Sequence, residues 1–136
     1  MSGREPTERW VLFFNRERML SIAPLALLFV AAGATHFTVP RFYLKIMPPW
    51  IARPRFWVAF TGACEIAGGI GLLLESTRAA AGWALCALLV AVFPANIQML
   101  RQEWPEASAL KRAALAARLP LQLPLIYWVY VAALRR

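Results

Sequence analysis

The chain has 136 residues, of which 60% are hydrophobic, and a formal net charge of +8. A soluble domain of this size cannot bury so much apolar surface in one core, so the composition predicts a membrane protein and excludes an ordinary soluble one. The basic residues lie between the apolar segments and at the two ends of the chain. Lipid headgroups, and not nucleic acid, are therefore the expected counter-ions.

Four apolar segments follow one another, and each is near the roughly 17 to 25 residues that cross a bilayer as a helix. They comprise residues 19–39, 56–74, 79–100 and 119–134, of which the last is slightly short. No segment alternates like a strand, and backbone groups cannot stay unpaired in lipid. The sequence therefore predicts an all-α fold, an integral membrane four-helix bundle that forms one domain over residues 19–136.

Residues 1–18 precede the first span and are expected to form an interfacial or cytoplasmic segment. Trp10, Phe13 and Phe14 recur there at helical spacing beside several arginines. A helix of this kind lies in the headgroup region with its aromatic side chains toward the lipid. We expect this segment to anchor the chain and not to form a site.

The connection between the first two spans, PRFYLKIMPPWIARP at residues 40–54, predicts a short interfacial helix. Pro40 suits a helical first turn, Tyr43 falls on an apolar face, and Arg41 and Lys45 fall on the opposite face. The next two prolines stop the helix. We expect it to lie flat on the membrane as a cap. The alternative is a lid over the mouth of the bundle, in which Tyr43 contacts a ligand.

Glu65 stands in the middle of the second span, in FWVAFTGACEIAGGIGLLL. An ionisable side chain at membrane depth costs roughly 2.5 to 3.5 kcal/mol, so it usually faces a partner, a water or a ligand inside the bundle. A neutral carboxyl can donate a hydrogen bond to a carbonyl, and one that exchanges protons can act as a general acid or base. Glu65 is therefore the first catalytic candidate.

Small residues occupy the positions three and four away from Glu65. They are Thr61, Gly62, Gly68 and Gly69. Small residues let transmembrane helices pack closely, and this is their commoner role. Missing side chains can also leave room for a flat ligand beside the carboxyl. Under that second explanation Gly62 and Gly69 are candidate ligand-binding positions.

The other polar residues of the spans are predicted to meet at one membrane face, because successive spans alternate in direction. That face collects His36, Asn96, Gln98, Arg118 and Gln122. Glu65 lies about ten residues from the start of its span, and so roughly 15 Å deep, below this layer. We expect a polar half-channel or pocket with Glu65 at its floor, and Asn96, Arg118 and Gln122 as ligand contacts.

His36 is the one histidine of the chain and the second catalytic candidate, as an acid–base partner of Glu65. The difference in depth argues against direct contact between them. With a single histidine, no metal site is predicted.

An arginine such as Arg118 reaching down would keep Glu65 charged, whereas an unpaired carboxyl would be neutral. Pro94 predicts a kink beside Asn96, because proline removes a backbone hydrogen bond.

Pieces in all four spans resemble the DoxX-like family of small bacterial membrane proteins. The pieces are AGATHFTVPRFYLKIMPPW (32–50), TGACEIAGGIGLL (61–73), FPANIQM (93–99) and RLPLQ (118–122). The resemblance implies a four-helix bundle in the bacterial plasma (inner) membrane with both termini cytoplasmic, an orientation that the evenly divided Lys and Arg residues do not decide. Members of the wider group are linked to quinone-associated oxidation, and those that handle thiols use cysteine pairs, which this chain lacks.

We therefore predict a quinone-linked or redox-accessory subunit, with a polar intramembrane pocket for a lipophilic ligand. No covalently bound cofactor is indicated, so electrons would come from a membrane oxidoreductase partner in the lipid bilayer. No nucleic-acid partner is expected, and the sequence leaves open both an oligomer and whether the protein is an enzyme. One alternative is a scaffold or small transporter with a structural Glu65–Arg118 ion pair. Another is an isomerase-like enzyme that acts on a membrane lipid through Glu65 and His36.

Overall fold

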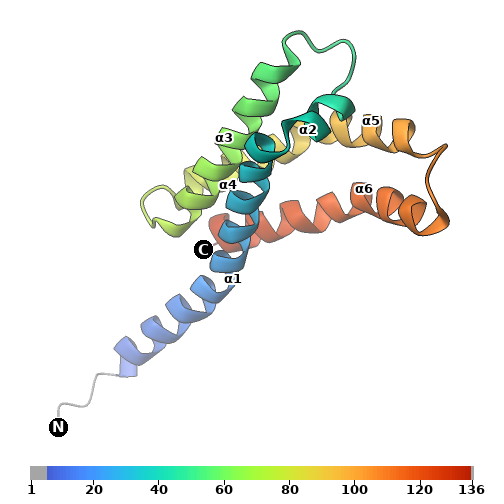
Figure 1. The fold of residues 1–136 in the computed structure, drawn as a ribbon. Helices are drawn as coiled ribbons and strands as arrows, with labels where there is room; N and C mark the ends of the chain where they lie inside the picture. The colour runs from blue at the N-terminus through green and yellow to red at the C-terminus, as the bar shows by residue number, and fades with distance from the viewer. Residues whose placement is uncertain (1–5, 136) are drawn as a thin grey trace.

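The computed structural model describes the backbone of residues 6–135 and the side chains of residues 16–135. Figure 1 shows its helices in chain order. They are α1 (Pro6–Thr38), α2 (Pro40–Ile46), α3 (Pro54–Leu73), α4 (Arg78–Ala91), α5 (Phe93–Glu103), α6 (Ala109–Val129) and the π-helix η1 (Tyr130–Leu134). Residues 6–135 contain no strand. The predicted all-α class is confirmed for that part of the chain.

Four helical stretches are long and apolar enough to cross a membrane. They are Arg16–Thr38, Pro54–Leu73, Arg78–Glu103 and Ala109–Leu134. Only 17 to 33% of their most apolar windows is buried inside the molecule, so most of their apolar side chains face outward. Contact of these apolar surfaces with water is unfavourable, whereas contact with the hydrocarbon of a bilayer is not. The chain thus has the helices expected of a multi-pass membrane protein.

Two helices begin ten or more residues before the predicted spans. α1 runs unbroken from Pro6, so the N-terminal segment and the first span share one helix, although the side chains of the predicted aromatic anchor lie outside the described residues. α6 begins at Ala109, because the Ser108 hydroxyl oxygen accepts a hydrogen bond from the Lys111 backbone N–H at 3.3 Å and caps the helix. Basic residues in its first turns concealed this start from a hydropathy pattern.

The kink predicted at Pro94 is present. The third span is divided into α4 and α5, with Val92 between them and Pro94 in the first turn of α5. Proline cannot donate a backbone hydrogen bond, so the regular hydrogen-bonding pattern of α4 does not continue through it. The Leu89 carbonyl in the last turn of α4 accepts a hydrogen bond from the side-chain amide of Gln122 on α6. A neighbouring helix therefore supports the broken span.

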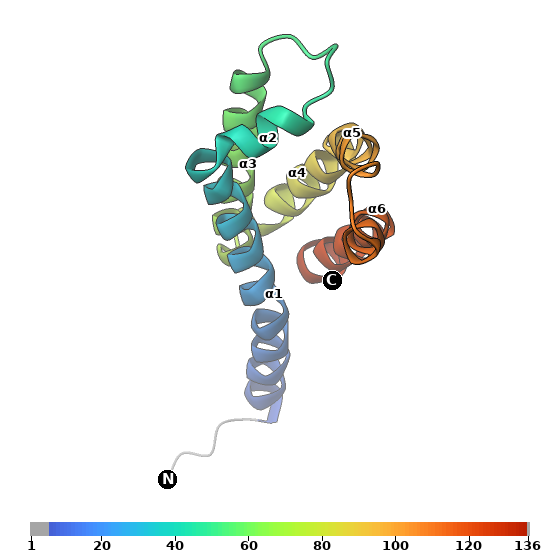
Figure 2. The same ribbon diagram turned by 45° about the vertical axis from the view of Figure 1, so that its right-hand side comes forward.

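Helices α1 and α3 pack side by side, with α2 lying across the end of α1 (Figure 2). Glycines bring the two backbones together. A Cβ atom on Gly33 would lie only 2.5 Å from the Gly62 carbonyl oxygen, and one on Gly69 only 2.8 Å from the Ala26 carbonyl oxygen. Small-residue contacts of this kind fix how far one helix is shifted along the other.

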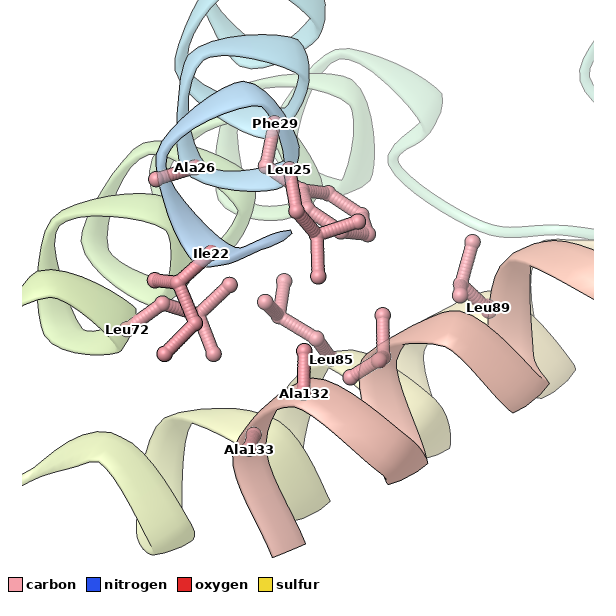
Figure 3. Packing of buried hydrophobic residues seen from close by; sticks show 10 residues of the cluster. Ile22, Leu25, Ala26, Phe29, Leu72, Leu85, Leu89, Ala132 and Ala133 are labelled. Carbon is pink, nitrogen blue, oxygen red and sulfur yellow. The ribbon is translucent and has the colours of Figure 1, made fainter. Parts of the chain in front are cut away.

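The main apolar core lies where α1, α3 and α4 meet the end of α6 and η1 (Figure 3). Its buried members are Ile22, Leu25, Ala26, Phe29, Leu72, Leu85, Leu89, Val129, Ala132 and Ala133. α6 runs across the direction of α1 in both views (Figures 1 and 2), so the spans are not simply aligned side by side. A smaller cluster joins α2 to α5 and α6 and consists of Ile46, Met99, Ala107 and Leu115.

Candidate functional site

The contact between α1 and α3 brings His36 directly beside Glu65. The Nδ1 atom of His36 lies 3.3 Å from the Oε2 atom of Glu65. The expectation that a difference in depth would keep the two apart is therefore wrong. α1 ends just after His36, whereas α3 begins roughly three turns before Glu65. The first turns of α3 thus extend past the end of α1, and His36 meets the middle of α3.

Glu65 is nearly enclosed at this contact, and one of its oxygens has no hydrogen-bond donor. The His36 and Glu65 side chains are only 9% and 13% exposed. His36 Nδ1 is 3.1 Å from the Ala32 carbonyl oxygen and forms its hydrogen bond there. Glu65 Oε2 is buried without a hydrogen-bond partner among the described residues. Such an atom is uncommon, because buried polar atoms are nearly always paired.

Tyr43 of α2 covers His36 from the side. The two rings stack with centroids 3.7 Å apart and planes 21° apart. The Tyr43 hydroxyl is 2.5 Å from Thr35 Oγ1, which donates to the Ala32 carbonyl oxygen, also at 2.5 Å. A threonine hydroxyl has one hydrogen, so Tyr43 is the donor to Thr35. We name Thr35, His36, Tyr43 and Glu65 the Glu65 group. Thr35 was not predicted, because its contact depends on α2 folding back over α1.

An ionic contact holds α2 in this position. The Lys45 ammonium lies 3.2 Å from Glu103 Oε1, and the Lys111 ammonium pairs with Glu103 Oε2 at 2.5 Å. Beneath these charges, Ile46 at the end of α2 packs in the smaller apolar cluster. Glu103 therefore links α2 to the ends of α5 and α6. The sequence alone did not single it out, since an acidic residue near a loop usually faces solvent.

The other predicted polar residues form a separate chain of hydrogen bonds. Arg118 Nε donates to Asn96 Oδ1 at 3.2 Å, and Asn96 Nδ2 donates to Gln122 Oε1 at 3.2 Å. Gln122 Nε2 then donates to the carbonyl of Leu89. We name Arg118, Asn96 and Gln122 with this carbonyl the Gln122 chain. The structure brings these three predicted residues together between α5 and α6, with no hydrogen bond or ion pair to His36 within residues 16–135.

Arg118 does not form the structural ion pair considered for Glu65. Within residues 16–135, the basic partner at salt-bridge distance from Glu65 is His36, and the Arg118 side chain is instead hydrogen-bonded to Asn96. Arg118 is still close enough for its charge to act on Glu65. The Gln122 chain therefore holds a positive charge near the Glu65 group without an ion pair or hydrogen bond to it within residues 16–135.

The glycines near Glu65 lie in tight contacts between helices. A Cβ atom on Gly62 would be 2.5 Å from the Cβ atom of His36, and one on Gly69 would meet the backbone of α1. One on Gly68 would meet the Leu85 side chain at 2.5 Å. The space next to these glycines is filled by the protein itself, which agrees with the helix-packing explanation for them.

The family comparison covers both polar groups. Residues 25–133 match a family described as "Domain of unknown function (DUF8561)". Neither the comparison with curated proteins nor that with solved structures finds a match. The matched segment includes every residue of the Glu65 group and of the Gln122 chain, and it spans most of the sequence. The chain belongs to the DUF8561 family.

Proposed function

We propose that this protein is a quinone-linked accessory subunit in the bacterial inner membrane, and that it binds the head group of a quinone-class lipid beside Glu65. The observation that carries the proposal is the buried Oε2 atom of Glu65, which has no hydrogen-bond partner among the described residues. A ligand oxygen at this point would supply the missing partner. The outward-facing apolar helices suit a ligand whose tail lies in the bilayer.

The Glu65 group provides the contacts that an aromatic head group needs. Glu65 and His36 offer hydrogen bonds, and the His36–Tyr43 stack offers flat apolar surface at the same place. Arg118 contributes positive charge without a direct ion pair. In this proposal Asn96 and Gln122 hold Arg118 in place and do not themselves contact the ligand.

The protein would handle protons, whereas the ligand and a partner would handle electrons. A bound quinone supplies the redox chemistry. Glu65 and His36 are an acid–base pair at 3.3 Å that can hold or release the proton that accompanies such a change. Because the sequence indicates no redox centre of its own, the proposal includes an electron-transferring subunit as partner. The resemblance to the DoxX-like family also supports a quinone-linked role.

The test is ligand-dependent thermal stability of the purified protein in detergent. A quinone at about a hundred times its Kd should add about 2.7 kcal/mol to the unfolding free energy. We expect short-chain ubiquinone or menaquinone to stabilise the wild type and to lose that effect in Glu65→Gln. Glu75→Gln is the matched control, since Glu75 is an exposed carboxyl between α3 and α4.

Circular dichroism and size-exclusion chromatography establish that each variant is folded before ligands are compared. If no quinone stabilises the folded wild type, the proposal is overturned. If quinones stabilise Glu65→Gln as much as the wild type, binding takes place elsewhere and Glu65 is not the site.

A second function is favoured by the direct contact between His36 and Glu65. Two acid–base groups whose nearest atoms lie 3.3 Å apart could together move a hydrogen within a membrane lipid, as an isomerase does. This candidate predicts turnover with no electron acceptor present. Incubation of the protein with membrane lipid extract in deuterated water, followed by mass spectrometry, would show deuterium incorporated by the wild type and not by Glu65→Gln. Equal incorporation by both proteins would exclude this function for the pair.

A further inference from the structure

We infer that the Glu65 group selects a ligand that donates a hydrogen bond, so that it holds the reduced, hydroxyl-bearing quinol in preference to the quinone. This inference rests on the proposed function, because it specifies which redox form of the same ligand occupies the site. It follows from the hydrogen-bonding capacity that the protein leaves unused at His36 and Glu65.

The tautomer of His36 is set by its neighbour on α1. The Ala32 carbonyl oxygen, 3.1 Å from Nδ1, can only accept a hydrogen bond, so Nδ1 carries a hydrogen. The other ring nitrogen, Nε2, forms no hydrogen bond with residues 16–135, but unlike Glu65 Oε2 it is not a buried unpaired atom. In a neutral imidazole that already has its hydrogen on Nδ1, Nε2 is purely an acceptor.

Glu65 offers an acceptor as well. We consider His36 and Glu65 as a pair that holds one exchangeable proton. If the pair's exchangeable proton is on Glu65, His36 Nε2 remains an acceptor. If the proton is on His36, both carboxylate oxygens of Glu65 are acceptors, including the buried Oε2. In either arrangement at least one acceptor lacks a donor from the described part of the protein. The position of the proton decides whether His36 Nε2 or Glu65 accepts a hydrogen bond. In both cases the ligand must supply the donor.

A quinone cannot meet that need, since its ring oxygens are carbonyls and only accept. A quinol hydroxyl both donates and accepts, so it satisfies the unpaired acceptor and also the donor of the pair. An acceptor that the bound ligand cuts off from water and leaves unpaired weakens binding by on the order of 5- to 150-fold. Arg118 does not reverse this preference, because its guanidinium donates equally well to a carbonyl and to a hydroxyl oxygen.

The experiment compares three ligands with the same ring and short tail on the wild-type protein. They are the quinol, kept reduced under anaerobic conditions, the quinone, and the quinol dimethyl ether, which lacks both O–H donors. Thermal stabilisation measured over a ligand series gives a Kd for each. We expect the quinol to bind roughly 5- to 150-fold more tightly than either of the others.

Each outcome separates this inference from the proposal beneath it. If the quinone binds as tightly as the quinol, or more tightly, the inference is overturned and the proposed quinone site stands. If none of the three ligands binds, both are overturned. If the dimethyl ether matches the quinol, the ring and tail are recognised without the hydroxyl hydrogen, and the inference again fails.

A variant locates the acceptor. His36→Phe keeps an aromatic ring to stack on Tyr43 but removes both nitrogens. We expect its quinol affinity to fall toward its quinone affinity, while the quinone affinity changes little. His36→Gln, which restores a side-chain acceptor, should recover part of the preference. An undiminished quinol preference in folded His36→Phe would overturn the role of His36 in this preference and leave Glu65 Oε2 as the acceptor.

Discussion

The Glu65 group and the Gln122 chain are both polar clusters inside apolar helices, but they differ in whether their buried polar atoms have hydrogen-bond partners. In the Gln122 chain consecutive hydrogen bonds run from Arg118 through Asn96 and Gln122 to the carbonyl of Leu89. In the Glu65 group one carboxyl oxygen is left over among the described residues. A satisfied polar chain stabilises a fold, whereas an unsatisfied one costs stability and suits a ligand. The comparison assigns the Gln122 chain a structural role and makes the Glu65 group the candidate for ligand binding.

The largest effect should come from breaking the satisfied chain. Gln122→Leu leaves the Leu89 carbonyl and the Asn96 amide without partners, and we expect a loss of about 1–3 kcal/mol in unfolding free energy. Thermal unfolding in detergent measures it. Gln98→Leu is the matched control, since the half-buried Gln98 makes no side-chain hydrogen bond within residues 16–135. Equal losses in the two variants would refute the structural role of the chain.

A smaller effect is expected within the Glu65 group. Tyr43→Phe keeps the ring that stacks on His36 but removes the hydroxyl that donates to Thr35. The expected loss is about 1 kcal/mol, with reduced quinol affinity because α2 is held less firmly over His36. Thermal unfolding with and without ligand measures both. Tyr130→Phe, on the exposed side of η1, is the control and should change neither quantity.

The ionic contact that fastens α2 should contribute less still. Glu103→Gln removes the carboxylate shared by Lys45 and Lys111, and partly exposed ion pairs contribute at most about 1 kcal/mol. Because salt screens such pairs, we expect wild-type stability to fall between low and high ionic strength more than that of the variant. Glu106→Gln should behave like the wild type. The same salt response in Glu103→Gln would show that the pairs do not hold α2.

The smallest effect on stability should come from the residue most important for function. Glu65→Met replaces a carboxyl whose Oε2 has no partner with an apolar side chain of similar length. Without ligand we expect unchanged or slightly increased stability, because no satisfied hydrogen bond is lost. Ligand-induced stabilisation should disappear. A large loss of stability without ligand would mean that Glu65 is structural, and the contrast with the Gln122 chain would no longer hold.

Much of the secondary structure was predictable, because apolar length and proline placement act locally. The all-α class follows from the apolar segments, and the break between α4 and α5 follows from Pro94. The start of α6 was missed, because a serine cap ahead of basic residues carries no hydropathy signal. The single helix α1 was missed for a similar reason, since a change in polarity does not interrupt helical hydrogen bonds.

The sequence by itself determined which side chains are unusual, because the cost of placing Glu65 in an apolar span depends only on its neighbours along the chain. Only the tertiary structure decided what they touch. The Gly33–Gly62 contact sets the shift of α1 against α3 and places His36 beside Glu65. The return of α2 adds Tyr43, and α6 takes Gln122 to the break in the third span. These contacts depend on close packing between distant segments, which no local pattern encodes.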